Sequence, residues 1–373
     1  MPEPRALRLL VLLTDAYGSQ GGIAKFNRDW LEALCTAPGV ASVTALPRVI
    51  SDEVGELPDR LEYVTAAAGG KVAYLAALAR VALRPFDAVL CGHLYLLPLA
   101  EVLARRYRAP LVLTLHGIEA WPRPPYWRRR AVSRVTSFVS VSEVTLQRFL
   151  AWSDAAPERG HVIPNCVDLS LYGPGPKPDA LLDRYGLRGR EVLMTLGRLA
   201  GRDRHKGFDE VMEALPTLLE DQPSLAYLIV GDGPDRPRLE TKAAALGLGK
   251  HVVFAGYAPE TEKADHYRLA DAYVMPSRGE GFGIVLLEAI ASGLPVVASA
   301  ADASREAVLD GELGEIVDPD DRTSVEAGIR GALRRGVGAV PEALDTFSKY
   351  RFRERWHAFV ETALASSIAG RHR

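Results

Sequence analysis

Short apolar runs alternate with amphipathic helical patterns along almost the whole chain of 373 residues, and this alternation constrains the fold more than any other feature. A strand that is apolar on both faces must be covered on both faces, as happens in a parallel sheet flanked by helices. The sequence therefore predicts an α/β protein built from doubly wound, Rossmann-like sheets.

The alternation occurs twice, and each occurrence is long enough for a sheet of its own. Helical patterns lie between the apolar runs, for example at Ile23–Cys35, Lys71–Leu83 and Leu97–Tyr107. In the first half, we expect strands at Leu7–Thr14, Val43–Leu46, Phe86–Cys91, Leu111–His116, Ser137–Val141 and His161–Ile163. In the second half, we expect strands at Val192–Gly197, Ala226–Gly231, His251–Ala255, Ala272–Met275, Pro295–Ser299 and Glu315–Val317.

The length of the chain is too great for one ordinary hydrophobic core and suits two domains. The Pro/Gly cluster at Gly173–Pro178 is the best linker in the sequence. We expect an N-terminal domain over residues 1–172, a linker at 173–178, a C-terminal domain over 179–345 and a helix over 346–373. Two such domains facing each other across a cleft are the simplest architecture.

The composition is that of a soluble globular protein, with 48% apolar and 25% charged residues, and the net charge of −2 requires no nucleic-acid partner. Cys35, Cys91 and Cys166 are odd in number and lack metal-site spacing, which favours a reducing compartment. No apolar run approaches the ~20 residues of a membrane span. We therefore expect a cytoplasmic protein.

The stretch PSRGEGFGIVLLEAIASG, at Pro276–Gly293, carries the strongest functional signal. Glycines precede a segment of good helix formers, so a helix is predicted to begin near Ile284 and to end before Gly293. Glu280 lies in the turn ahead of this helix and Glu288 lies within it.

A helix N-terminus favours phosphate, and carboxylates accept hydrogen bonds from vicinal hydroxyls. Gly283 and Glu288 are about 7–8 Å apart along a helix. A diphosphate at the turn would thus place one sugar near each acid, which is the layout of a nucleoside diphosphate sugar. A surface helix with two solvated glutamates is the alternative interpretation.

Glu280, seven intervening residues and Glu288, with Gly281-Phe282-Gly283 between them, resemble the glutamate-pair motif of retaining glycosyltransferases of family 4. The resemblance implies the GT-B fold, in which a C-terminal helix returns to the first domain. It also implies that Glu280 contacts hydroxyls of the donor sugar, that Glu288 contacts the ribose, and that the backbone of Gly281–Ile284 holds the diphosphate.

Two cations follow the strand expected at Val192–Gly197, namely Arg198 and Lys206. Ligands bind at the carboxyl edge of a parallel sheet, and the two cation types suit a diphosphate, although a solvated loop is also compatible. The resemblance implies that Arg198 and Lys206 neutralise the leaving diphosphate. Arg202, Arg204 and His205 lie in the same loop.

Two further features come after strands of the first half. Gly21 and Gly22 open the helical pattern behind the first strand, and His116 ends a later strand. Each is compatible with a purely structural role. The resemblance implies that the glycines lie over the donor diphosphate and that His116 lies near the anomeric centre, so His116, Arg198, Lys206 and Glu280 are the candidate catalytic residues.

Two motifs suggest other chemistry, and the surrounding residues argue against it. Gly231-Asp232-Gly233 resembles part of a dinucleotide fingerprint, but Arg236 occupies the third glycine position. Asp318-Pro319-Asp320 matches a metal-chelating DxD, yet it precedes a helical segment, where Asp is a usual turn or cap residue. We expect neither a metal nor a cofactor.

The stretch Arg123–Arg134 interleaves arginines with Tyr126 and Trp127, and such clusters can rest on an anionic membrane or form a solvated helix face. The predicted function is retaining, metal-independent transfer of a hexose-type sugar from a UDP- or GDP-sugar to a sugar or lipid-linked acceptor. Membrane contact would make the enzyme peripheral at the inner membrane face. The alternatives are a non-catalytic glycosyltransferase-like subunit and a GT-B nucleotide-sugar epimerase or hydrolase.

Overall fold

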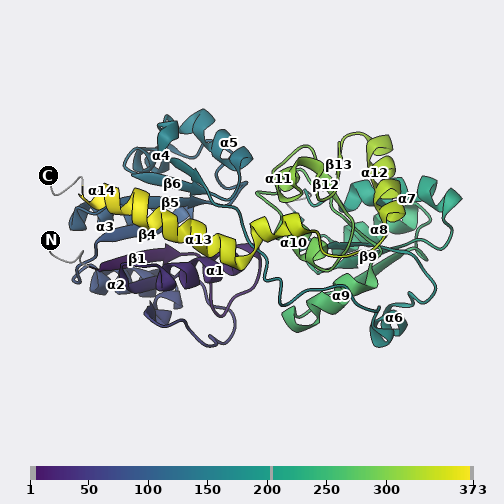
Figure 1. Ribbon diagram of the computed structural model, residues 1–373, viewed down its shortest axis with the longest axis horizontal. Helices are drawn as coiled ribbons and strands as arrows, with labels where there is room; N and C mark the ends of the chain where they lie inside the picture. The colour runs from purple at the N-terminus through teal and green to yellow at the C-terminus, as the bar shows by residue number, and fades with distance from the viewer. Residues whose placement is uncertain (1–5, 202–204, 370–373) are drawn as a thin grey trace. The chain divides into compact units, whose positions relative to one another are not determined.

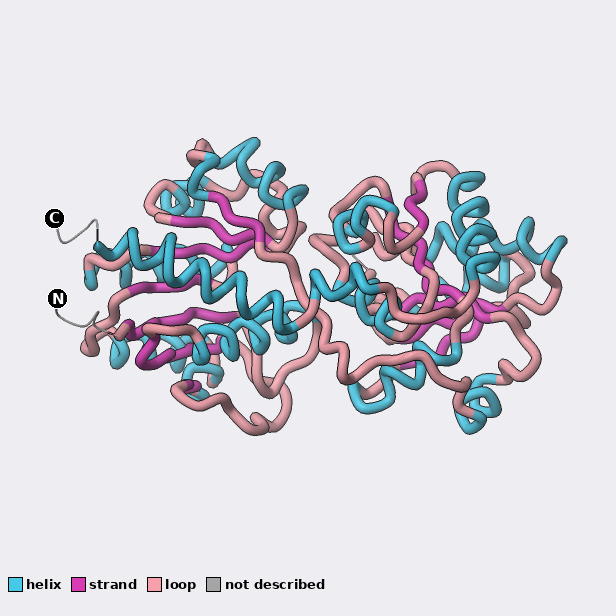
Figure 2. The backbone as a smooth tube through the Cα atoms, viewed as in Figure 1, coloured by secondary structure: helices cyan, strands magenta, loops and turns pink. Residues whose placement is uncertain are grey.

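The computed structural model describes residues 6–201 and 205–369, and Figure 1 labels its helices and strands. The chain forms two compact units, one of Met1–Cys166 with Lys349–Arg373 and one of Val167–Ser348. Figure 2 shows the strands of each unit in magenta with helices in cyan alongside them.

The first unit contains a seven-stranded parallel sheet with the order β3-β2-β1-β4-β5-β6-β7. One of its inner strands, β1, is apolar and fully buried from Leu9 to Leu13, because both faces of the sheet are covered. The elements are β1 (Leu7–Leu13), α1 (Gly22–Thr36), β2 (Val40–Pro47), β3 (Leu61–Tyr63), α2 (Lys71–Val81), β4 (Ala88–Cys91), α3 (Leu97–Tyr107), β5 (Leu111–Leu115), α4 (Tyr126–Val132), β6 (Ser137–Ser140), α5 (Glu143–Ser153), β7 (Gly160–Val162), α13 (Lys349–Phe359) and α14 (Ala365–Ala369).

Two sets of helices cover this sheet. Buried residues of α2, α3 and α4 share one core with β1, β4 and β5. Elsewhere in this unit α1 packs against α13, with the rings of Trp30 and Trp356 5.2 Å apart and those of Phe26 and Phe352 5.7 Å apart. The last helical segment thus completes the first unit.

The second unit contains a six-stranded parallel sheet with the order β10-β9-β8-β11-β12-β13. Its core joins β8, β9 and β11 to α7, α8 and α12. The elements are α6 (Asp179–Tyr185), β8 (Val192–Leu196), α7 (Phe208–Asp221), β9 (Ala226–Val230), α8 (Arg236–Ala245), β10 (Val252–Gly256), α9 (Lys263–Leu269), β11 (Ala272–Val274), α10 (Ile284–Ala291), β12 (Val296–Ser299), α11 (Ser304–Ala307), β13 (Glu315–Val317) and α12 (Arg322–Arg335).

The predicted fold class, two doubly wound parallel sheets, is confirmed. The expected strands all occur, within a few residues at each end, and the structure adds the short strand β3. Gly173–Pro178, expected as a linker, belongs to the second unit, where Arg268 donates to the carbonyl oxygen of Gly173 and Lys177 pairs with Asp271. The helical segment expected from residue 346 begins at Lys349 and contains one π-helical turn, Val360–Leu364.

Candidate active site

The first turn of α10 stands at the carboxyl edge of the second sheet, because the segment before it follows β11. The helix begins at Ile284, as predicted. Gly283 ahead of it has a φ of 96°, a backbone conformation that residues with a side chain rarely adopt. Phe282 is buried and packs edge-to-face on Phe347 at 5.4 Å. A buried ring therefore fixes a turn whose first amide groups have no partners within the helix.

Glu288 lies on α10 with its carboxylate fully buried. Tyr267 of α9 donates a hydrogen bond to it at 2.9 Å, and the ammonium of Lys263 lies 2.9 Å away. A buried carboxylate is retained at low cost only where it is paired and hydrogen-bonded. Glu288 is thus a fixed acceptor and not a solvated surface residue.

Lys206 and Glu280 form a direct ion pair, although 74 positions separate them in the chain. Both side chains are mostly shielded from water, at 23% and 12% exposure. Burial lowers the pKa of Lys206 to about 8; Asp302 opposes this shift and Arg198 adds to it. A cation that has lost its water in this way gains from an anionic ligand.

Asp302 organises the turn that carries Glu280. One of its oxygens, Oδ2, accepts from the hydroxyl of Ser277 at 2.8 Å and from the amide of Glu280 at 2.7 Å. The other oxygen accepts from the amide of Ser304 at 3.0 Å. Burial raises the pKa of Asp302, and these hydrogen bonds and Lys206 oppose the shift. The carboxylate therefore fixes the backbone at Glu280 and lies close to Lys206.

Arg198 lies at the carboxyl end of β8 with an exposed side chain. The adjoining backbone is held by the segment after β9, because Leu199 donates to the carbonyl of Asp232 at 3.0 Å. A Cβ on Gly231 would lie 2.0 Å from the carbonyl oxygen of Gly197, so the Gly-Asp-Gly segment is a site of close backbone packing. Arg202 and Arg204 lie outside the described residues.

In the first unit, Gly21 and Gly22 precede and open α1, and Gly21 has a φ of 105°. The ring of His116, which follows β5, packs edge-to-face on Phe26 of α1 at 4.9 Å. Its Nε2 lies 2.7 Å from the carbonyl oxygen of Gly92. Since a carbonyl only accepts, Nε2 carries the hydrogen, and Nδ1 is the nitrogen that can accept from a ligand.

The structure therefore brings the predicted residues together in two groups. Lys206, Glu280 and the first turn of α10 form the group in the second unit, with Glu288 farther along the same helix. Gly21, Gly22 and His116 gather at the start of α1 in the first unit. Sequence reasoning missed Asp302, Lys263 and Tyr267, since each meets its glutamate only through the fold and none belongs to a recognisable motif.

Within the residues that the structure describes, no group of three or more His, Cys, Asp or Glu side chains is arranged to hold a metal ion. The acids of Asp318-Pro319-Asp320 have other roles: Asp318 accepts from the amide of Asp320 at 2.9 Å, and Asp320 pairs with Arg278 at 2.7 Å. These contacts support the interpretation of this DxD as a turn ahead of α12.

Two family models match the chain. Residues 184–350 match Glycosyl transferases group 1, and residues 34–171 match Glycosyltransferase Family 4. The GDP-mannose-dependent alpha-(1-6)-phosphatidylinositol monomannoside mannosyltransferase of Mycolicibacterium smegmatis is 36% identical over 271 residues, which are 67% of this chain and 70% of that relative. The phosphatidyl-myo-inositol mannosyltransferase of the same organism is 40% identical over 192 residues, 50% of this chain and 47% of that relative.

A solved structure of the Anabaena protein HepE, in complex with UDP and glucose, matches 95% of this chain and all of that chain with a TM-score of 0.74. At 19% sequence identity, this similarity shows the fold. The two parallel sheets and this similarity define the GT-B fold. The chain belongs to glycosyltransferase family 4, a retaining family, and is a glycosyltransferase that uses a nucleotide-sugar donor. The predicted family and enzyme class are confirmed.

Proposed function

We propose that this enzyme transfers a mannosyl residue from GDP-mannose to a hydroxyl of an inositol-containing phospholipid. The observation that carries the proposal is the 36% identity, over 70% of its length, to a GDP-mannose-dependent phosphatidylinositol monomannoside mannosyltransferase. A second mannosyltransferase named for phosphatidyl-myo-inositol supports the same acceptor class.

The diphosphate of the sugar donor lies against the first turn of α10 and is neutralised by Lys206 and Arg198. The direct contact between Lys206 and Glu280 supports this assignment, because it brings a cation and an acid into one cluster. On binding, Lys206 gains a phosphate oxygen as a partner, and the carboxylate of Glu280 turns to the hydroxyls of the sugar. Glu288, already fixed by Lys263 and Tyr267, accepts from the ribose.

In the reaction, the bond between the anomeric carbon and the β-phosphate oxygen breaks, and negative charge accumulates on the departing diphosphate. The cations and the helix N-terminus stabilise this charge more strongly in the transition state than in the bound donor. The acceptor hydroxyl forms the new bond from the face that the diphosphate leaves, and its proton passes to the diphosphate. His116, through Nδ1, accepts a hydrogen bond from the sugar beside the reacting carbon.

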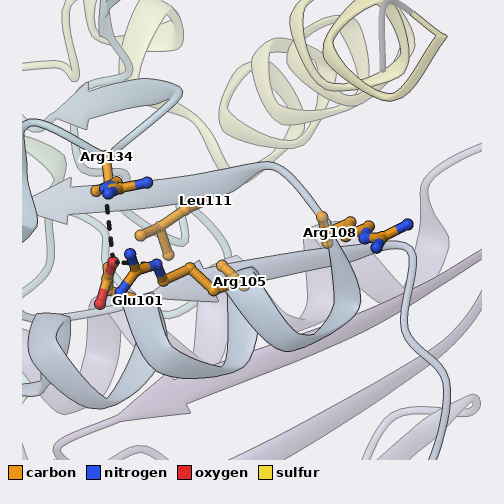
Figure 3. A pocket seen from close by; sticks show the side chains of 7 residues that line it. Glu101, Arg105, Arg108, Leu111 and Arg134 are labelled. Carbon is orange, nitrogen blue, oxygen red and sulfur yellow. Dashed lines mark ion pairs between the residues drawn. The ribbon is translucent and has the colours of Figure 1, made fainter. Parts of the chain in front are cut away.

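A lipid acceptor requires contact with a membrane surface, and the arginines of α3 and α4 support such a contact. Arg105 and Arg134 pair with Glu101 beside a pocket of about 220 Å³, and Arg108 lines the same pocket farther along (Figure 3). An adjoining pocket of about 280 Å³ adds Arg130. Four arginines around one acid give this surface a net positive charge, which anionic lipid attracts.

An apolar segment accompanies these arginines. Val72, Leu75 and Leu83, on or just beyond α2, are 83%, 54% and 81% exposed. Since α2, α3 and α4 share one core, they lie on the same face of the sheet. Among the described residues, no helix is both long and apolar enough to cross a bilayer. We therefore propose peripheral binding, with apolar side chains entering the lipid surface and arginines facing its phosphates.

The membrane proposal is tested by sedimentation with phosphatidylcholine vesicles that contain or lack phosphatidylinositol. Binding should require the anionic lipid, should weaken with salt and should fall in an R130Q/R134Q variant. An R334Q/R335Q variant, altered on α12 of the second unit, serves as the control. Equal binding to both kinds of vesicle would contradict the proposal.

The reaction is tested by incubating the protein with GDP-mannose and phosphatidylinositol or its monomannoside, with UDP-glucose and UDP-galactose as alternative donors. We expect acceptor-dependent release of GDP and a mannosylated lipid, with most activity retained in a chelator. GDP release at the same rate with and without the acceptor would indicate a hydrolase. Inactivity with every donor would indicate a non-catalytic subunit. Loss of activity on chelation would refute metal independence.

A further inference from the structure

Arg128, the third residue of α4, lies over two aromatic rings. The carbon of its guanidinium lies 4.3 Å from the centre of the Tyr95 ring and 4.6 Å from that of Trp127. Tyr95 follows β4 and Trp127 belongs to α4, so two separate segments fix this cation. A cation–π contact of this kind occupies no N–H group of the guanidinium, so these groups can still donate hydrogen bonds.

Arg128 also differs from the arginines around Glu101 in having no acid of its own. In the described part of the chain, no carboxylate lies within ion-pair distance of Arg128, and its Nε is shielded from water without a hydrogen-bond partner. A guanidinium that no carboxylate neutralises favours an anion as its ligand, and its terminal N–H groups are the donors that it offers to one.

The surroundings of Arg128 place it at the same edge of the sheet as His116. The ring of His93 lies 4.6 Å from that of Tyr95 and 6.2 Å from that of His116. Burial lowers the pKa of His93 to about 4; Glu119 opposes this shift, and the nearby His116 and Arg128 add to it. His93 is therefore neutral at physiological pH, which leaves Arg128 as a fixed cation close to His116.

We propose that Arg128, which lies over the rings of Tyr95 and Trp127, binds the phosphate group of the acceptor. This inference rests on the proposed function, since it assigns His116 to the reaction centre and takes the acceptor to be phosphorylated. The donor diphosphate has its own cations, Arg198 and Lys206, in the second unit. A planar guanidinium hydrogen-bonds two oxygens of a phosphate at once, and the adjoining rings offer flat surface to a polyol ring.

The test compares myo-inositol 1-phosphate with unphosphorylated myo-inositol, both soluble, so that membrane binding does not enter. In the presence of GDP, calorimetry should show that R128Q binds the phosphorylated compound about 10- to 100-fold more weakly than the unaltered enzyme. R128K keeps the charge but lacks the planar guanidinium, so its affinity for myo-inositol 1-phosphate should lie between those of R128Q and the unaltered enzyme. R353Q is the control: it removes an exposed arginine that lies 5.6 Å from the Tyr350 ring on α13. Its affinity for myo-inositol 1-phosphate should equal that of the unaltered enzyme.

Kinetics supply the second readout. R128Q should raise the KM for the phosphorylated acceptor, leave the affinity for GDP unchanged and preserve the melting temperature. Equal effects on both acceptors, or no effect on either, would overturn the inference, as would failure of the unaltered enzyme to bind myo-inositol 1-phosphate. If GDP-mannose is not the sugar donor, the proposed function fails, but the binding comparison still decides the role of Arg128.

Discussion

Lys206 is mostly buried and contacts the acid assigned to the sugar, and burial lowers its pKa to about 8, a shift that a bound phosphate would oppose. Such a group contributes most when negative charge accumulates beside it, which occurs as the diphosphate leaves. Its removal should therefore affect catalysis more than folding.

We predict that K206A lowers kcat/KM by about 10²- to 10³-fold while the melting temperature changes little. Steady-state kinetics and thermal melting check the two halves of this prediction. K242A is the control, because Lys242 on α8 is likewise a partly buried lysine in ion pairs, in its case with Asp209 and Glu213. Parallel losses of activity and stability in K206A would assign Lys206 a structural role.

We infer that Asp302 acts through Glu280, as a positioning residue. Its Oδ2 accepts two hydrogen bonds and its Oδ1 accepts one from the amide of Ser304. An asparagine can keep its oxygen at the first two donors, but it lacks the charge near Lys206 and turns an NH2 group toward Ser304. We predict that D302N lowers kcat/KM for the sugar donor by at least about tenfold, mainly through kcat, since small misplacements of reacting groups are costly. Because burial raises the pKa of Asp302, stability should not fall in parallel. A loss of stability equal to the loss of activity would refute the positioning role.

At the scale of single residues, the sequence identifies a candidate site residue well when that residue belongs to a local motif. Glu280 and Glu288 were predicted as a pair because Gly281–Gly283 lie between them in the chain. Asp302 and Lys263 could not be found in this way. They meet Glu280 and Glu288 across the ends of different strands, and an isolated Asp or Lys carries no sign of its partner.

At the scale of elements, the loops after β8 and β9 depend on each other. Leu199 donates to Asp232, and Asp235 donates back to Leu199 at 3.1 Å. A Cβ on Gly233 would lie 2.2 Å from the carbonyl oxygen of Leu199, so this loop accepts no side chain there. The position of Arg198 follows from this packing.

We predict that G231A weakens the affinity for the nucleotide and destabilises the second unit, because the loop bearing Arg198 must move away. Calorimetric titration with GDP and thermal melting check both effects. G249A is the control, since a Cβ on Gly249 meets nothing within 4 Å, and its effect should stay within about 0.5 kcal/mol. Unchanged GDP affinity in G231A would contradict the role assigned to this loop.

The helix α13 packs on α1 through a cluster of aromatic side chains. Trp356 is fully buried against Trp30, whereas Tyr350 on the same helix is 54% exposed. We predict that W356A lowers the free energy of unfolding by about 3–5 kcal/mol, the usual cost of a large buried aromatic, and that Y350A changes it little. Urea unfolding, followed by circular dichroism, measures both. Equal effects of W356A and Y350A would contradict the observed packing.

The elements themselves were largely predictable, because a parallel sheet covered on both faces requires apolar strands. The strand β3 is the exception: only Tyr63 of its three residues is buried, so no apolar run marks it. Gly173–Pro178 was expected to be a linker from its composition alone. Its contacts with Arg268 and Asp271 are tertiary, across 95 and 94 positions, and leave no trace in the local sequence.

At the scale of the whole molecule, the two units divide the assigned groups. The acids, cations and helix turn assigned to the nucleotide sugar belong to the second unit, apart from Gly21 and Gly22. His116 and Arg128, assigned to the anomeric centre and to the acceptor phosphate, belong to the first. The repeated alternation in the sequence predicted two units. It could not show that Arg128 contacts two aromatic rings, because Tyr95 and Trp127 are about 30 positions apart in the chain.

We predict that GDP raises the melting temperature more than UDP or ADP at equal concentration. A ligand that binds only the folded state adds about 2.7 kcal/mol at a hundred times its Kd. A thermal-shift series with the three nucleotides measures this preference. A larger shift with UDP would contradict the assignment of the base and leave the class of enzyme intact.

A crystal structure of the enzyme with bound GDP tests the central claim most directly. The account predicts the diphosphate within hydrogen-bonding distance of the Gly283 and Ile284 amides, with Lys206 on its oxygens and the ribose at Glu288. A diphosphate bound elsewhere, with the first turn of α10 making no contact with it, would contradict the account.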